Sequence, residues 1–331
     1  MKTGNFIISL DFELRWGAVE KWPAHQTENK FLNTRVAIYK ILELFEEYGI
    51  NATWATVGYL FADTRAELDF NLPDLKPKYL DSRISTYTSF SDGSLGNNEI
   101  EDKSHYAYSI IKQISKTPNQ EVASHTFSHF YTLEDGQNLD DFNADISSAV
   151  SIANRMLSLE LVSLVFPRNQ FNSVYLEALS KHGFEFARSN PDNWIWRGAT
   201  GISSRILAKF LVLMRGLDLI LPISNTLFDS DNLDGVDGIT LIPSSRFLRP
   251  YAKRESIINY FKLMRIKKEM TKAAKLGLSY HLWWHPHNFS ADIHGNVKYL
   301  AEILSHYKKL NMKYSFQSKC MKDLVGIEST I

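Results

Sequence analysis

The sequence predicts an α/β fold in which a parallel sheet closes, or nearly closes, into a (β/α) barrel. Short apolar runs alternate with helical patterns along nearly the whole chain, as in βα units on a parallel sheet. About seven strand candidates occur, without a linker between two cores, so we expect a seven-stranded barrel in one domain over residues 1–331. No glycine-rich nucleotide-binding loop follows the first strand, which disfavours an open, doubly wound sheet with a nucleotide cofactor.

Each element has a local signal. The first strand is the apolar run 6–10, and a helix over 34–48 follows, with Asn33 as a candidate N-cap and Gly49 as its stop. A second strand is expected at 51–57. After it, strands and helices alternate at 105–114 (helix), 121–124 (strand), 139–157 (helix), 161–166 (strand), 173–182 (helix), 184–187 (strand), 255–276 (helix), 278–284 (strand) and 296–310 (helix).

Two stretches are expected to be long loop insertions. Residues 63–102 are rich in Asp, Ser, Pro and Gly and have no clean period, and residues 195–239 form the second insertion. Within the latter, residues 203–221 are rich in Leu and Ile but contain four charged side chains. At about +2.5 to +3.5 kcal/mol each at a bilayer centre, these charges exclude a membrane span. The segment is either a helix packed on the barrel or a peripheral membrane contact.

Composition narrows the function classes. The chain has 331 residues, 37 basic and 37 acidic side chains and a formal net charge of zero. These charges are interspersed and form no basic stripe, so we expect no nucleic-acid partner. The single cysteine, Cys320, excludes an intramolecular disulfide framework and a cysteine-rich zinc site. The apolar run near the N-terminus is too short for a signal peptide, so we expect a cytoplasmic protein.

His125 and His129 are the first candidates for chemistry. They follow a predicted strand and lie four residues apart, so on a helix they would share one face and could bind one metal ion. Taken alone, the spacing also fits two structural histidines, one on a helix face and one bonded to a backbone carbonyl.

Other polar residues follow the ends of the remaining strands, where a parallel barrel gathers its catalytic groups. Asp11 and Glu13 follow the first strand on one side of it, as a cation ligand and a base would, although a capping Asp and a solvated Glu are the alternative. Arg168 and Asn169 follow the fourth strand. The fifth strand precedes Asp192 and Trp194, and the last contains Trp284 and precedes His285. The tryptophans fit either a sugar-binding surface or the core.

In this order, the motifs resemble those of the polysaccharide deacetylase family (NodB-homology domain, carbohydrate esterase family 4). They are Asp11-Phe12-Glu13, His125-Thr126-Phe127-Ser128-His129, Pro167-Arg168, Asp192 with Trp194, and Leu282-Trp283-Trp284-His285. The chain departs from the family pattern in three places: the carboxylates are separated by one residue, Arg follows Pro instead of preceding it, and one extra residue separates Leu from His. His281 and His287 therefore compete with His285.

The resemblance implies a metal-dependent carbohydrate N-deacetylase. Glu13, His125 and His129 would bind one divalent ion, most often zinc in the family. Asp11 would be the base and His285 the acid. Arg168 would favour the ionised form of Asp11, and Asp192 would orient Arg168 or His285. Asn169, Trp194 and Trp284 would contact the sugar. The family fold that the resemblance implies is a distorted (β/α) barrel, often with seven strands.

The expected substrate is an amino sugar in a glycan or a glycan precursor of surface polysaccharide biosynthesis. Two alternatives stay open at this point. The same barrel could hydrolyse a non-sugar amide or a cyclic ureide, because fold and metal site do not determine the substrate. The chain could also be a catalytically idle carbohydrate-binding homologue.

Overall fold

The computed structural model describes residues 2–21, 28–191, 193, 214, 218 and 223–324. In this part of the chain the strands form one ten-stranded sheet, and nine of them follow the order β6-β7-β5-β4-β3-β2-β1-β9-β8, with β10 paired to β1. The α/β architecture is thus confirmed, with a curled sheet that is consistent with a distorted barrel. The predicted count of seven strands is not confirmed.

The first strand lies near the middle of this sheet. β1 (Asn5–Phe12) is buried along its whole length, as its apolar sequence requires. It pairs in parallel with β2 (Ala52–Thr56) and β9 (Tyr280–Trp284). The parallel series continues through β3 (Gln120–Ser124), β4 (Ser163–Val165), β5 (Phe186–Ser189) and β7 (Ile239–Pro243).

β7 and β8 lie toward opposite ends of the sheet, although they are consecutive strands along the chain. β7 pairs with β5, whereas β8 (Arg246–Phe247) pairs with β9. Only Ser244 and Ser245 separate β7 from β8. The Ser244 amide donates to the carbonyl of Ser189 at 3.0 Å, and the Ser245 amide donates to that of His281 at 2.8 Å. The chain therefore changes partner strand within two residues, which curls the sheet toward closure.

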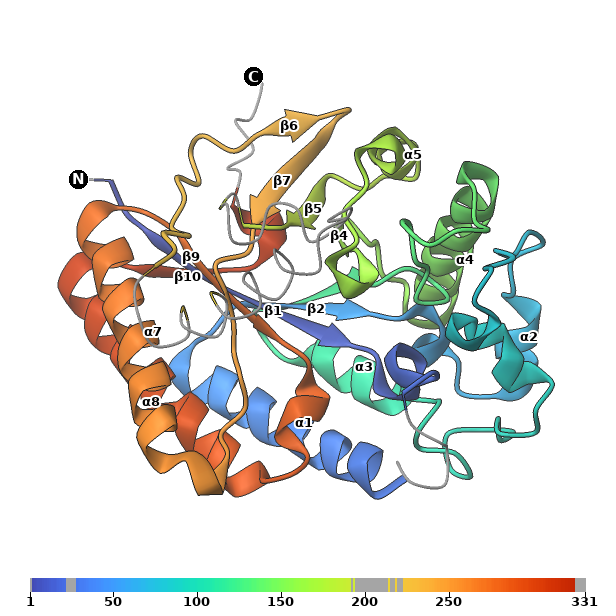
Figure 1. Cartoon of the computed structure of the whole chain (residues 1–331), viewed down its shortest axis with the longest axis horizontal. Coiled ribbons are helices and arrows are strands. Elements are labelled where there is room, and N and C mark those ends of the chain that lie inside the picture. The colour runs from blue at the N-terminus through green and yellow to red at the C-terminus, as the bar shows by residue number, and fades with distance from the viewer. Residues whose placement is uncertain are drawn as a thin grey trace.

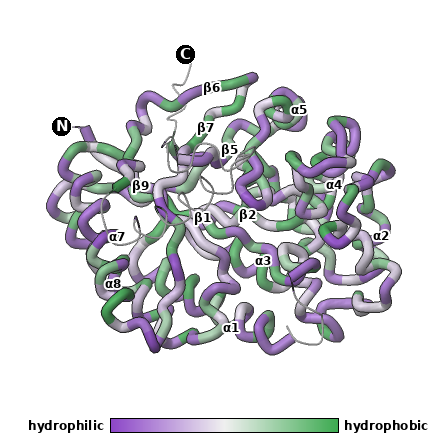
Figure 2. The backbone as a smooth tube through the Cα atoms, viewed as in Figure 1, coloured by the Kyte–Doolittle hydropathy of each residue, from purple (hydrophilic) through white to green (hydrophobic). Residues whose placement is uncertain are grey.

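Helices cover the outside of the curled sheet (Figure 1). α1 (Glu28–Tyr48), α7 (Ser256–Leu276) and α8 (Ile293–Tyr314) lie side by side, and α1 and α7 both contact α8. The others are α2 (Arg65–Phe70), α3 (Tyr108–Lys116), α4 (Leu139–Leu157) and α5 (Leu176–Lys181). Hydrophobic and hydrophilic residues alternate along the helices, as expected of helices with one buried face (Figure 2).

Several predicted elements differ from the structure. The helix over 139–157 is α4 with identical bounds, but α1 begins before the proposed cap at Asn33. The stretch 63–102 contains α2, which begins with a capping box between Thr64 and Glu67 that the sequence analysis overlooked. The short strands β6 (Gly235–Val236), β7, β8 and β10 (Gln317–Lys319) were not predicted.

Some expectations lie beyond these observations. Most of the segment 203–221 is outside the described residues, so its packing or membrane contact stays a prediction. The same holds for one domain over residues 1–331. Among the helices that the structure describes, none combines the length and apolar character needed to cross a membrane.

Candidate active site

β1 supplies the two carboxylates of the site. Asp11 lies near the end of β1, and Glu13 is the N-cap residue of the 3-10 helix η1 (Leu14–Ala18). Both side chains are almost fully buried. The helix η1 folds back closely over Glu13, because a Cβ atom at Gly17 would lie 1.9 Å from Glu13 Oε2. Glycine at position 17 thus allows the carboxylate to be enclosed.

His125 and His129 lie in a loop after β3, and not on the helix considered for them. The loop contains two residues in the left-handed region, Thr126 and His129, with φ angles of 63° and 59°. These turns bring the two imidazole rings to a centroid separation of 5.1 Å. The pair therefore converges through loop geometry instead of helical periodicity.

This loop, residues 125–131, is fixed from two sides; we call it the histidine loop. The amides of Phe127 and Ser128 donate to the two carboxylate oxygens of buried Asp145, at 2.7 and 3.0 Å. From the other side, the Gly58 amide donates to the Thr126 carbonyl at 2.9 Å. A Cβ atom at position 58 would lie 2.7 Å from the Cα atom of Phe127. Asp145 and Gly58 thus set the position of both histidines.

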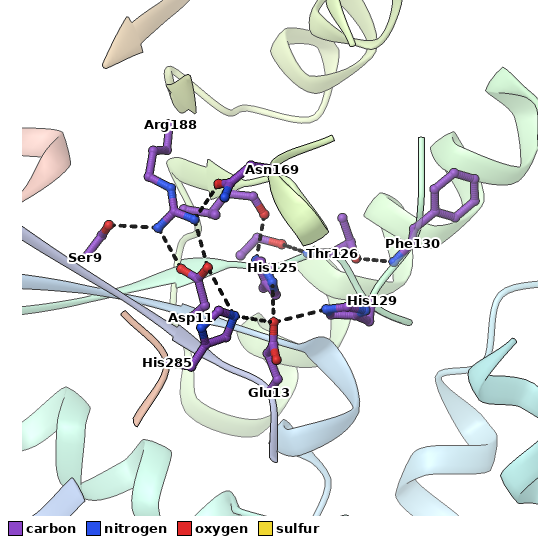
Figure 3. Close-up of polar contacts among 12 residues, drawn as sticks. Ser9, Asp11, Glu13, His125, Thr126, His129, Phe130, Asn169, Arg188 and His285 are labelled. Atoms are coloured by element: carbon purple, nitrogen blue, oxygen red, sulfur yellow. Dashed lines mark hydrogen bonds and ion pairs between the residues drawn. The ribbon is translucent and has the colours of Figure 1, made fainter. Parts of the chain in front are cut away.

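Three ligand atoms converge in this arrangement (Figure 3). Glu13 Oε1 lies 3.2 Å from His125 Nε2 and 3.1 Å from His129 Nε2. His125 Nδ1 lies 2.8 Å from the carbonyl oxygen of Val165, which can only accept a hydrogen bond. Nδ1 therefore carries the hydrogen, and Nε2 of the neutral ring turns a lone pair toward the carboxylate.

A lone pair and a carboxylate oxygen attract each other only when a cation lies between them. A proton can meet this need, and so can a divalent metal ion. The bond to the Val165 carbonyl also fixes the ring orientation and the tautomer, as a second partner does for metal-binding histidines. Glu13, His125 and His129 therefore fit one metal ion.

A guanidinium group contacts Asp11, but it belongs to Arg188. In β5, Arg188 donates from Nη1 and Nη2 to the two oxygens of Asp11 at 2.7 and 2.8 Å. It also donates to Ser9 Oγ at 3.0 Å and to Asn169 Oδ1 at 2.8 Å. Its side chain is fully buried. This bidentate pair fixes the orientation of Asp11.

The prediction that Arg168 contacts the base is therefore wrong. Arg168 forms an ion pair with Glu20, lies 3.6 Å from Glu134 and covers the ring of Tyr131. It still lines the pocket above the site. Its place after Pro167, where the chain departs from the family pattern, had left this contact open.

Of the three late histidines, His285 approaches the carboxylates. Its Nε2 lies 3.4 Å from Glu13 Oε1 and 3.8 Å from Asp11 Oδ2. His281 is buried and bonded to Ser9 Oγ and the Pro243 carbonyl. His287 lines the pocket beside His285, with 4.9 Å between the rings.

The charges of the site influence one another. Burial opposes ionisation of Asp11, but Arg188 outweighs it and holds the pKa of Asp11 below its usual value. Burial opposes the charged form of Glu13 too, yet His285 and His129 bring its pKa well below the usual value. Burial alone would lower the pKa of His285, but Glu13 and Asp11 raise it. The metal-free site thus favours anionic carboxylates beside a protonated His285.

A pocket of about 290 Å³ lies over these groups, and a second pocket of about 330 Å³ adjoins it. Both are lined by Asn169, Phe247, Trp283 and His285. The rings of Phe247 and Trp283 lie 4.8 Å apart at an angle of 61°, and Arg188 covers the Trp283 ring. An aromatic wall therefore runs from the carboxylates into the second pocket.

Trp284, predicted to contact the sugar, is instead a core residue. It is fully buried, stacks on Phe289 and meets Phe45 edge to face. Side chains alternate along a strand, so Trp283 shares the inner face of β9 with His281 and is the tryptophan that lines the pocket. The alternation of side chains along a strand could already have distinguished Trp283 from Trp284 in the sequence.

The remaining predicted residues divide into two groups. Asn169 lines both pockets and accepts the hydrogen bond from Arg188. Asp192 and Trp194 lie outside the described residues, so their roles stay predictions.

Sequence reasoning missed Arg188 and Asp145. The signal for Arg188 was an arginine within a strand that is buried on both faces. No comparable sequence signal marked Asp145.

Comparison with known proteins supports the resemblance for the middle of the chain. The family model for polysaccharide deacetylase matches residues 34–187. Residues 34–187 thus resemble the polysaccharide deacetylase family. This match confirms the predicted resemblance, and it includes β2 to β4 with both histidines and ends within β5, one residue before Arg188. Asp11, Glu13 and His285 lie outside the matched residues. No curated protein matches the chain.

Solved structures share the fold at low sequence identity. A protein from Mycobacterium smegmatis assigned as a polysaccharide deacetylase has a TM-score of 0.59 and 13% identity, covering 98% of this chain and 89% of the other. An allantoinase, PuuE, has a TM-score of 0.55 and 8% identity, with the same coverage. A GH57-type branching enzyme from Pyrococcus horikoshii has a TM-score of 0.50 and 12% identity, covering 98% and 71%. These proteins share an architecture with this chain, and the architecture alone does not determine the reaction.

Proposed function

We propose that the protein is a metal-dependent hydrolase that removes an N-acetyl group from an amino sugar. One observation carries this proposal: a set of ligands formed by Glu13, His125 and His129 lies beside a carboxylate fixed by arginine and beside a third histidine. Amide hydrolysis needs a base for water and an acid for the amine. Asp11 would be this base and His285 this acid.

Glu13, His125 and His129 would bind one divalent ion, for which the family resemblance favours zinc. When bound, such an ion polarises the acyl oxygen and lowers the pKa of a water molecule from 15.7 to about 7. An oxygen ligand with two imidazole nitrogens is a common donor set for zinc in hydrolases.

Asp11 would accept a proton from the water that attacks the acetyl carbon. Arg188 keeps Asp11 ionised and holds both of its oxygens, so Asp11 enters the reaction as a base in a fixed orientation. His285 would donate a proton to the leaving nitrogen as the carbon–nitrogen bond breaks. The products are acetate and the free amine of the sugar.

The pockets favour a ring-shaped substrate beside this nitrogen. Trp283 and Phe247 offer apolar faces, and Asn169 offers a polar edge. Sugar rings combine apolar faces with hydroxyl groups and fit such a surface. We propose a glycan or a glycan precursor of surface polysaccharide biosynthesis as the source of the amino sugar.

Acetate release from N-acetylated amino sugars by the purified protein tests the proposal. A chelator should abolish release, and added zinc should restore it. Asp11→Asn should retain the metal, by elemental analysis, while kcat falls about 10²- to 10⁴-fold. His125→Ala should lose both metal and activity. Unchanged acetate release in either variant would refute the assignment.

The same preparation distinguishes the alternatives. A metal-loaded protein that cleaves a cyclic ureide or a simple amide, but no N-acetyl sugar, would retain the mechanism and replace the substrate. A protein that binds amino sugars without releasing acetate in the presence of the metal would be a carbohydrate-binding homologue.

A further inference from the structure

The first half of α7 exposes several large apolar side chains. Ile257, Ile258, Tyr260, Phe261 and Met264 are 72%, 41%, 59%, 47% and 46% exposed; we call them the α7 apolar face. In the described part of the chain, 16 large hydrophobic residues are exposed, and these five lie within eight consecutive positions. Single exposed apolar residues are ordinary, whereas a contiguous group marks an interaction surface.

Basic side chains surround this face. Residues 249–268 contain seven basic residues and one acidic residue, but Lys262 and Arg265 are buried, and Arg265 and Lys267 pair with Glu269 and Glu302. Arg249, Lys253, Arg254 and Lys268 are exposed, and the acidic residue, Glu255, lies 3.5 Å from Lys262. The surface therefore combines exposed apolar groups with a local excess of positive charge.

A groove of about 480 Å³ runs beside the α7 apolar face, between the starts of α7 and α8. Lys253 and Tyr260 line one side of the groove and Lys298 the other, together with the carboxylates of Asp292 and Glu302. The same chain segment also reaches the active site, because Arg249 lines the pocket next to His285. The charged apolar surface and the substrate pocket are thus joined by the chain segment 249–256.

We propose that the α7 apolar face docks on an anionic lipid bilayer. Ile257, Phe261 and their neighbours would enter the interface, while Lys253 and Arg254 contact lipid phosphates. Charge decides between a bilayer and a second copy of the chain. A two-fold contact through this face would bring the same cations of both copies together, whereas an anionic membrane complements them. Docking places the substrate pocket near the membrane and does not depend on the reaction.

Vesicle co-sedimentation of the purified full chain tests this proposal. Vesicles of phosphatidylcholine mixed with phosphatidylglycerol should bind the protein, and vesicles of phosphatidylcholine alone should bind it much more weakly. Ile257→Ser with Phe261→Ser should weaken binding at least about tenfold. Lys253→Glu with Arg254→Glu should weaken vesicle binding about fivefold for each cation removed. Added salt should also weaken the binding of the wild type to anionic vesicles.

Matched controls lie on other surfaces. Val174→Ser with Met312→Ser removes two apolar side chains that are 69% and 74% exposed, and Lys308→Glu with Lys309→Glu reverses two neighbouring charges on α8. Both control variants should bind vesicles like the wild type. The proposal is overturned if the wild type does not bind anionic vesicles, or if the α7 variants bind as well as the controls. It is also overturned if gel filtration shows a dimer that Ile257→Ser with Phe261→Ser dissociates.

Discussion

Arg188 and Arg168 are two arginines at one site with different partners. Arg188 neutralises the buried Asp11, whereas Arg168 pairs with Glu20 at the pocket rim. Removing a buried partner leaves an uncompensated charge, which costs about 3–5 kcal/mol. The two side chains should therefore respond very differently to substitution.

Arg188→Met should shift the pH dependence of the metal-loaded enzyme. Arg188 lowers the pKa of Asp11, and burial raises that pKa once the arginine is gone. The base is active when ionised, so the acidic limb of the kcat/KM profile should move to higher pH. In the wild type, the stability contributed by Asp11 is present above its unfolded pKa and is lost as pH falls through its lower folded pKa.

Arg168→Met is the matched control for this experiment. It should leave the acidic limb in place, because its guanidinium group pairs with Glu20 and not with Asp11. Equal shifts in both variants would mean that Arg188 has no specific effect on the base.

At the scale of elements, the histidine loop depends on residues that touch no ligand atom. Gly58→Ala would place a Cβ atom 2.7 Å from the Cα atom of Phe127, so the loop must move and carry the histidines with it. We expect metal affinity to fall about 10- to 100-fold, the usual effect of disturbing the support of metal ligands. Isothermal titration with zinc measures the change.

Gly235→Ala is the control for position 58. A Cβ atom at Gly235 meets nothing within 4 Å, so metal affinity should remain that of the wild type. An unchanged affinity in Gly58→Ala would show that the loop adapts to the added methyl group.

Features that depend on residues close together in the sequence could be predicted, and features that depend on contacts between distant residues could not. Strand ends and their order along the chain are local signals, so Asp11, Glu13, His125, His129 and His285 could be proposed together. The loop conformation that brings the histidine pair together is not a property of the i, i+4 spacing. The pairing of Arg188 with Asp11 joins two strands that are not neighbours in the sheet. Only the three-dimensional register reveals such a contact.

The same limit applies to the sheet. The strands β1, β2 and β4 lie in apolar stretches, whereas β8 has two residues and depends on its pairing with β9. The change of partner at Ser244 and Ser245 is a tertiary event, so the sequence did not reveal it. α2 is a different case, because its capping box was visible in the sequence.

For the whole molecule, the ligand set joins distant parts of the chain. Glu13 follows β1, and both histidines follow β3. A metal ion that binds only to the folded state, at a concentration of 100 times its Kd, should add about 2.7 kcal/mol to the free energy of unfolding. A chelator should therefore lower the Tm by a few degrees, as measured by differential scanning calorimetry.

His125→Ala provides the comparison for this measurement. This variant should unfold at the same temperature with and without chelator, because it lacks a ligand. A chelator effect of equal size in both proteins would place the stabilising metal elsewhere.

The central position of β1 has a consequence for synthesis of the chain. Residues 6–10 of β1 pair on one side with β9, residues 280–284. A ribosome thus releases one of the most apolar strands of the protein long before its partner exists. Until then, this open edge can pair with other nascent chains. Chains that end before β9 should therefore aggregate or require a chaperone.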